Sequence, residues 1–181
     1  MTRKEMTDSV ANTSVLESLQ ARVDMAHNAL ADLFVSIHCN AGGGSGVETY
    51  CFSKNSYAGA LAELVQENIT DCTDLYDRGV KTANFFVIQN TLMPAILIET
   101  GFIDSVRDIE ILISGEGQSN IAEAIAEAIC QYDEMEKQDF RFLTEVNEKP
   151  VNAHGLSEKE LTGDAENIGD DETVQEEELD L

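Results

Sequence analysis

Positive charge is scarce in this sequence: 11 Lys and Arg residues stand against 35 Asp and Glu residues, and the formal net charge is -24 at pH 7. Binding to nucleic-acid phosphates needs a basic surface, so this balance argues against a nucleic-acid partner. It also argues against electrostatic attachment to anionic lipid. The imbalance is greatest in residues 133–181, which contain 17 acidic and 4 basic side chains.

Long hydrophobic runs are also absent. No segment approaches the roughly 18 apolar residues that a membrane helix needs, so we expect no membrane span. The first thirty residues lack the continuous apolar core of a signal peptide. The cysteines form no C-x-x-C pair, and their spacing predicts free thiols in place of a disulfide or zinc framework; they are Cys39, Cys51, Cys72 and Cys130.

Short apolar runs alternate with segments of helical periodicity. The runs at 33–37 and 95–98 are apolar throughout except for Ser36, as is typical of strands buried on both faces of a parallel sheet. Alternating strands and helices predict an α/β fold, with a mostly parallel twisted sheet flanked by helices. The predicted helices are 15–31, 57–69, 104–113 and 118–132, the predicted strands are 33–37, 47–52, 85–88 and 95–98, and a turn is predicted at 77–79.

The apolar periodicity fades beyond about residue 137. The acidic end of the chain offers too little apolar surface to offset the entropy lost on ordering. The sequence therefore predicts a folded domain over residues 1–137 and a disordered acidic tail over 138–181.

Two of the predicted strands lead directly into a titratable residue, His38 after the first run and Glu99 after the second. If these strands are parallel, both side chains reach the same edge of the sheet, where ligands bind in open α/β folds. A neutral imidazole is a common metal ligand or proton shuttle. A partly desolvated carboxylate has a raised pKa, which suits a general base. A purely structural role for each residue is the competing interpretation.

Four further segments stand out along the chain: SIHCNA at 36–41, GVETY at 46–50, DRGVK at 77–81 and MPAILIETGFI at 93–103. In order and interval they resemble the motifs of the zinc-dependent N-acetylmuramoyl-L-alanine amidases of type 3. The chain resembles this family over roughly residues 2–132, and Thr2-Arg3 resembles the end of the family's second strand.

The resemblance implies a phosphorylase/hydrolase-like α/β fold and a peptidoglycan hydrolase. Such enzymes cleave the amide between N-acetylmuramic acid and the L-alanine of the stem peptide, so the expected location is the cell wall or the extracellular space. By resemblance, His38 is a zinc ligand and Glu99 is the catalytic base that accepts a proton from the zinc-bound water. Zinc held in an open site lowers the pKa of its water to about 7.

The chain departs from the family pattern at its beginning. The family's domain starts with a strand leading into D-P-G-H-G-G, whose His is the first zinc ligand, and a Glu further on is the second. We therefore expect an N-terminally truncated domain that lacks the first strands and two zinc ligands; neither His27 nor His154 matches a family ligand. A misassigned start codon, a broken gene and a degenerate relative are the open explanations. The alternative function is an inactive remnant that binds muropeptides or a protein.

Four further residues have two interpretations each. Glu48 is either a replacement zinc ligand or an ordinary strand residue of the family. Arg78 and Lys81 either contact carboxylates of the substrate or form salt bridges. Cys39 is either a nucleophile beside His38 or, because neighbouring strand residues face opposite ways, a residue of the other face. The sequence assigns no substrate-binding residue.

Overall fold

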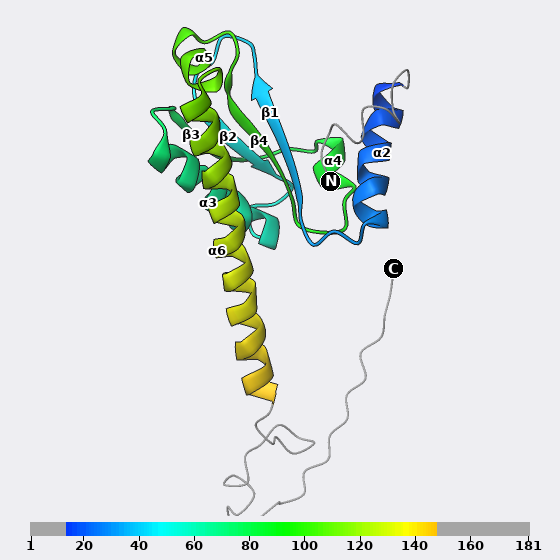
Figure 1. Cartoon of the computed structure of the whole chain (residues 1–181). Helices are drawn as coiled ribbons and strands as arrows, with labels where there is room; N and C mark the ends of the chain where they lie inside the picture. Colours follow the sequence, from blue (N-terminus) through cyan, green and yellow to red (C-terminus); the bar gives the residue numbers. More distant parts are fainter. Residues whose placement is uncertain (1–13, 148–181) are drawn as a thin grey trace, which may run out of the picture. The chain divides into compact units, whose positions relative to one another are not determined.

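The computed structural model describes the backbone of residues 14–147 and the side chains of residues 14–138 (Figure 1). The chain divides into two units after Gln138, and the β-sheet lies in the first. The helices are α2 (Val15–Asn28), α3 (Tyr57–Cys72), α4 (Phe86–Gln89), α5 (Val106–Leu112) and α6 (Gly115–Asn147), and the strands are β1 (Phe34–Asn40), β2 (Val47–Cys51), β3 (Asp77–Thr82) and β4 (Ala95–Phe102).

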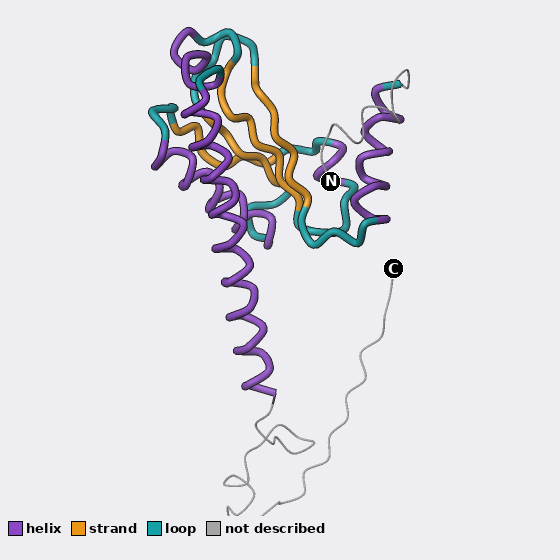
Figure 2. Tube along the Cα trace, in the orientation of Figure 1, coloured by secondary structure: helices purple, strands orange, loops and turns teal. Residues whose placement is uncertain are grey.

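The four strands form a mixed sheet in the order β1-β4-β2-β3 (Figure 2). β1 pairs with β4 in parallel, β2 pairs with β3 in parallel, and the central pair, β2 with β4, is antiparallel. The predicted α/β class and the helix-flanked sheet are confirmed. Within the described residues, β1 and β3 are the edge strands, so β4 and β2 are paired on both sides.

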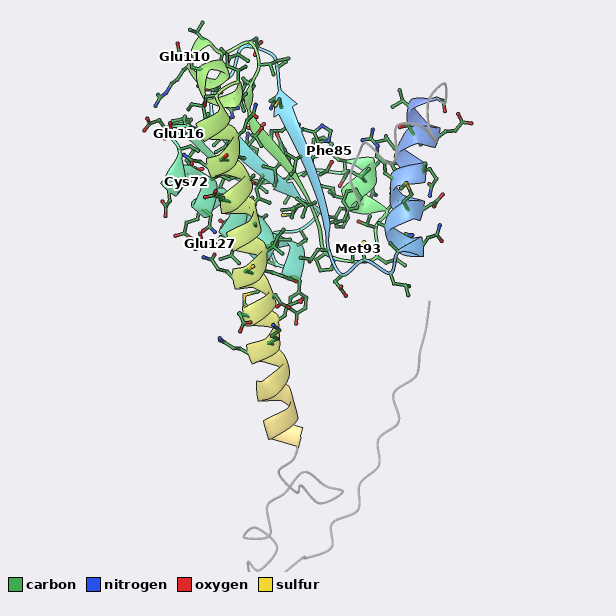
Figure 3. The ribbon with its side chains drawn as sticks, viewed as in Figure 1. Cys72, Phe85, Met93, Glu110, Glu116 and Glu127 are labelled. Atoms are coloured by element: carbon green, nitrogen blue, oxygen red, sulfur yellow. The ribbon has the colours of Figure 1, made fainter. Side chains whose placement is uncertain are left out.

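Each face of the sheet has its own hydrophobic core. Ile96 and Ile98 pack with residues of α3 and α6, whereas Ala95 and Leu97 pack with Val23 of α2 and with α4. This alternation follows from the two-residue period of a strand. Figure 3 places the labelled residues accordingly: Phe85 lies on the side of α2 and α4, and Cys72 lies on the opposite side.

The beginning of α2 follows the capping signal in the sequence. The Ser14 hydroxyl accepts a hydrogen bond from the Glu17 amide at 3.3 Å, and the Glu17 carboxylate accepts one from the Ser14 amide at 2.7 Å. This reciprocal capping box satisfies two amides that would otherwise lack partners at the helix end. The helix then buries Val23, which is 1% exposed, against the sheet.

Two predicted elements are wrong. Residues 85–88 were expected to form a strand, but Phe86–Gln89 is the single helical turn α4, whose Val87 and Ile88 are buried. A four-residue apolar run has no periodicity that separates a strand from a buried helical turn. The expected turn at 77–79 is instead the start of β3, where Gly79 occupies a bulge with φ of 74°.

The other elements match their predictions with shifted ends. β1 and β4 continue past His38 and Glu99 to Asn40 and Phe102. The helix α6 runs to Asn147, so the backbone is helical where the sequence predicts the start of a disordered tail; the remainder of that predicted tail lies outside the described residues. No helix in the described part of the chain is long and apolar enough to cross a membrane.

Candidate active site

His38 and Glu99 lie side by side on neighbouring strands. They are Cα partners in the parallel pairing of β1 with β4, and side chains at paired positions project from the same face of a sheet. This face is the one that packs on α2 and α4, because Phe34 and Leu97, an even number of residues earlier on each strand, belong to that core. The residues that the sequence singles out for chemistry therefore share one surface.

A third titratable residue extends this row. Glu48 on β2 is the Cα partner of Glu99 on β4 in the antiparallel pairing. The row His38, Glu99, Glu48 thus crosses three adjacent strands. Residues directly opposite each other on antiparallel strands have Cβ atoms about 4.5–5.5 Å apart, so the two carboxyl groups are close neighbours.

Irregularities in strand pairing shape the surface around this row. The register of β1 and β4 shifts after His38 and Glu99, so that Asn40 pairs with Phe102 and β4 contains one extra residue. Gly101, with φ of 146°, takes this bulge without a side-chain penalty. A second shift places Arg78 and Gly79 of β3 opposite the single residue Glu48 of β2.

Glu48 is a buried carboxylate with a full set of donors. Its side chain is 3% exposed. One oxygen, Oε1, accepts hydrogen bonds from the Tyr50 hydroxyl at 2.7 Å and from Asn40 Nδ2 at 2.9 Å. The other, Oε2, accepts one from Arg78 Nε at 2.6 Å and one from Lys81 Nζ. With both oxygens engaged by protein donors, Glu48 is bound as a structural anion.

The two carboxyl groups have opposite pKa shifts. Burial opposes ionisation of Glu48, but the hydrogen bonds from Lys81, Arg78 and Tyr50 together outweigh it and lower the pKa of Glu48 to about 2. Burial raises the pKa of Glu99 above its usual range, and the negative charge of Glu48 raises it further. A raised pKa makes Glu99 a better proton acceptor once it is ionised.

Glu99 has an unsatisfied oxygen. Among the described residues, its Oε2 is buried and has no hydrogen-bond partner in the protein. Such atoms are rare in folded proteins because an unpaired buried oxygen costs about 1–3 kcal/mol. An oxygen of this kind beside an imidazole suits a site that accepts a proton or a donor from a bound molecule.

His38 is oriented by its own strand. Its Nε2 lies 2.8 Å from the Ser36 hydroxyl, two residues earlier on the same face. A cavity of about 290 Å³ between α2 and β1 reaches His38, and Arg22 and Met25 line it from α2. The imidazole is therefore accessible from the α2 side.

The loop after β1 is tied to the segment after β4 by two aspartates. Asp108, which is fully buried, accepts hydrogen bonds from Ser45 Oγ at 2.6 Å, from the Gly46 amide at 2.7 Å and from the Phe102 amide at 2.9 Å. Asp104, at the surface, accepts from the amides of Gly42 and Gly43, both at 2.8 Å. These bonds hold the ends of β1 and β4 in place just beyond His38 and Glu99.

The described residues do not by themselves fit a catalytic zinc ion. Such an ion needs three protein ligands, and no group of three His, Cys, Asp or Glu side chains in the described part of the chain could hold a metal. Both oxygens of Glu48 are engaged, which removes it as the replacement ligand considered above. The donor set here is limited to His38, beside the unpartnered oxygen of Glu99.

The structure also gives the positions of the other candidate residues. Arg78 and Lys81 form salt bridges with Glu48. Cys39 lies on the opposite face from His38, because its Sγ is 3.5 Å from Oγ1 of Thr100, the residue after Glu99. On α2, His27 accepts a hydrogen bond from the Leu92 amide at 3.2 Å. The remaining histidine, His154, lies outside the described residues.

Sequence reasoning missed the residues that surround Glu48. Nothing in the spacing of Asn40 and Tyr50 indicates that they share an acceptor on β2. One signal was available for Tyr50, because residues two apart on a strand share a face. The role of Asp108 also went unnoticed, since its partners are mainly backbone amides, which carry no signature in the sequence.

Comparison with known proteins identifies the family of this chain. The sequence profile of the Amidase_3 family, described as N-acetylmuramoyl-L-alanine amidase, matches residues 1–131. The amidase CwlM of Bacillus licheniformis is 40% identical over 115 residues, which are 63% of this chain and 46% of that protein. The sporulation-specific N-acetylmuramoyl-L-alanine amidase of Bacillus subtilis is 36% identical over 121 residues, 66% of this chain and 48% of that protein. The chain thus spans about half the length of these relatives.

Solved structures agree with the fold. The catalytic domain of CwlV, an N-acetylmuramoyl-L-alanine amidase from Bacillus (Paenibacillus) polymyxa var. colistinus, superposes with a TM-score of 0.60 at 36% identity, over 64% of this chain and 65% of that chain. The N-acetylmuramoyl-L-alanine amidase of Clostridium difficile 630 superposes with a TM-score of 0.62 at 30% identity, over 72% and 79%.

Proposed function

Because this chain belongs to the N-acetylmuramoyl-L-alanine amidase family, we propose that it acts on peptidoglycan in the cell wall. The reaction is hydrolysis of the amide between N-acetylmuramic acid and the L-alanine that begins the stem peptide. The observation that supports this proposal is the pairing of His38 with Glu99, whose buried Oε2 has no partner among the described residues.

In the proposed reaction, Glu99 is the general base. Its raised pKa favours taking a proton from the attacking water, and the protonated carboxyl then donates that proton to the leaving amine of L-alanine. The unpartnered Oε2 is the atom proposed to receive the proton. Besides burial, the negative charge of Glu48 beside it raises the pKa of Glu99 and so favours the protonated form that donates to the amine.

Zinc is part of the proposal, with His38 as one ligand. A zinc ion held there would supply polarisation of the scissile carbonyl and would lower the pKa of its bound water to about 7. The described residues bring one of the usual three ligands. The two other ligands of the family pattern match no residue of this sequence.

The test is hydrolysis of purified peptidoglycan by the full 181-residue chain, with and without added zinc. We expect new N-terminal L-alanine amines, counted by amine labelling and mass spectrometry. Glu99→Gln should lower the rate about 10²–10⁴-fold, the usual contribution of a general base. A rate equal to that of the wild type would refute the role of Glu99.

A matched control uses Lys54→Gln, an exposed residue beyond the far end of β2, which should keep the wild-type rate. Metal content of the purified chain is measured in parallel by elemental analysis. If the wild-type chain releases no L-alanine amine from peptidoglycan with zinc in excess, the hydrolase proposal fails for this chain.

A further inference from the structure

Arg78 and Lys81 are cations held at one rim of the sheet by a buried anion. Both contact Oε2 of Glu48, and their side chains are 31% and 35% exposed. Two cations and one carboxylate leave one positive charge on this cluster, in a chain whose formal net charge is -24. An anion that approaches this rim meets two partly exposed cations.

The bulge in β3 brings these two cations to the same face. Arg78 and Lys81 are three residues apart, and an odd separation along a regular strand would place them on opposite faces. The extra residue opposite Glu48, with Gly79 at φ of 74°, restores the shared face. Because of this bulge in β3, both Arg78 and Lys81 contact Glu48.

The guanidinium of Arg78 is held in one orientation, and its terminal amino groups can still donate hydrogen bonds. Its Nε is bound to Glu48, and its Cζ lies 5.0 Å from the centroid of the Phe102 ring. No residue in the described part of the chain accepts a hydrogen bond from its two terminal amino groups. Two parallel N–H donors with a fixed orientation match the two oxygens of a carboxylate.

The distance from Glu99 suits a peptide substrate. Arg78 contacts Glu48, which is one strand away from Glu99, and β3 is one strand further. With strands about 4.8 Å apart, the guanidinium lies roughly 5–10 Å from Glu99. An extended peptide advances about 3.3–3.6 Å per residue, so a charge on the second residue after the scissile bond would arrive at this distance.

We propose that Arg78, supported by Lys81, binds a carboxylate of the stem peptide, and that Glu48 is the positioning residue that holds both cations beside Glu99. This inference rests on the proposed amidase function, which supplies the peptide. In this arrangement the free carboxylate on the residue that follows L-alanine pairs with the terminal amino groups of Arg78. Glu48 touches the cations and not the substrate.

The test compares two muramyl dipeptides that differ in one group. Both contain N-acetylmuramic acid and L-alanine, and the second residue carries either a free carboxylate or the corresponding carboxamide. Binding is measured by calorimetry on the full chain with Glu99→Gln, so that neither ligand is consumed. We expect the carboxylate ligand to bind about tenfold more tightly, as for a charge-assisted hydrogen bond at a partly exposed site.

Variants assign the preference to its residues. With Arg78→Gln added, the preference for the carboxylate ligand should disappear. With Arg78→Lys, part of the preference should remain, because Lys keeps the positive charge but lacks the paired N–H donors of the guanidinium. Lys54→Gln, the matched control for loss of one positive charge, should leave the preference intact. Raising the salt concentration should weaken it, and inorganic phosphate should compete with the carboxylate ligand better than chloride does at equal ionic strength, because an Arg fork also binds phosphate oxygens.

Several outcomes would overturn the subsite. They are equal binding of the two ligands, no binding of either at millimolar concentration, or a preference that survives Arg78→Gln. Both ligands are compared on the same Glu99→Gln protein, so the only variant that this comparison needs folded is Glu99→Gln, which circular dichroism checks. Hydrolysis of both dipeptides at equal rates would refute the subsite and leave the amidase proposal standing. A binding preference for the carboxylate ligand, without hydrolysis of either ligand by the wild type, would support the subsite and refute the amidase proposal.

Discussion

Glu48 and Glu99 face each other on adjacent antiparallel strands, and their carboxyl groups lie in opposite environments. Glu48 accepts hydrogen bonds from four side chains and has a pKa of about 2, whereas Oε2 of Glu99 is buried without a partner and its pKa is raised. Two glutamates thus differ in ionisation because their hydrogen-bond partners differ. One stabilises the sheet, and the other is left reactive.

Removing the charge of Glu99 should stabilise the protein. The folded-state pKa is raised, so the ionised carboxylate disfavours the folded state at any pH above its ordinary value. We expect Glu99→Gln to increase the free energy of unfolding at pH 7 by about 0.5–2 kcal/mol, typical of substitutions that remove active-site strain. Urea unfolding followed by circular dichroism measures this change.

The same variant supplies its own pH control. Near pH 4 the wild-type carboxyl is already neutral in the folded protein, so the gain should shrink. Glu123→Gln, at an exposed position on α6, should change the stability little at either pH. A loss of stability with Glu99→Gln at pH 7 would contradict the interpretation of Glu99 as a strained group.

Replacing Glu48 should have the opposite effect. Its pKa falls from 4.5 to about 2 on folding, so its carboxylate stabilises the fold above pH 4.5, and this contribution is lost as the pH falls toward 2. The shift corresponds to about 3–4 kcal/mol at pH 7. We expect Glu48→Gln to lower the free energy of unfolding at pH 7 by roughly that amount. Between about pH 5 and pH 2, the stability of the variant should fall less steeply than that of the wild type.

Lys81→Gln is the matched comparison for Glu48. Its side chain is 35% exposed, and Glu48 would keep Arg78, Tyr50 and Asn40 as donors, so the loss should be well below that of Glu48→Gln. Equal losses for the two variants would show that the buried carboxylate is not the centre of this cluster.

Asp108 should be important for stability because of the amides it satisfies. Replacement by Ala removes the acceptor of Ser45, Gly46 and Phe102, and we expect a loss of about 3–5 kcal/mol in the free energy of unfolding. The exposed Asp104, which also accepts two amides, serves as the control and should cost far less. Chemical denaturation of both variants decides the order, and a smaller loss at Asp108 than at Asp104 would be inconsistent with its role.

Cys39 should be dispensable for hydrolysis. Its thiol lies beside Thr100 on the face away from His38. The variant Cys39→Ala should therefore keep the wild-type rate, and because the side chain is exposed its stability should change by no more than about 0.5 kcal/mol. Rates before and after alkylation of the thiols provide a second measurement. Inactivation by the substitution alone, in a protein that unfolds normally, would revive the cysteine nucleophile.

The juxtaposition of His38 and Glu99 was predictable from the sequence. Each follows a short apolar run, and such runs identify buried strands whose ends meet at one edge when they are parallel. The surroundings of Glu48 were not predictable, because the bulge at Gly79 reverses the face on which Arg78 or Lys81 would otherwise lie. The helical turn at Phe86–Gln89 was missed because four apolar residues fit a strand equally well.

The position of β4 between two partners has a consequence for motion. Glu99 is held by backbone ladders on both sides, whereas His38 lies on β1, which in the described part of the chain is paired on one side only. Amides of β4 should thus exchange with deuterium only in large openings, and the outward amides of β1 should exchange in small local ones. We therefore expect the backbone around Glu99 to open less often than the backbone around His38.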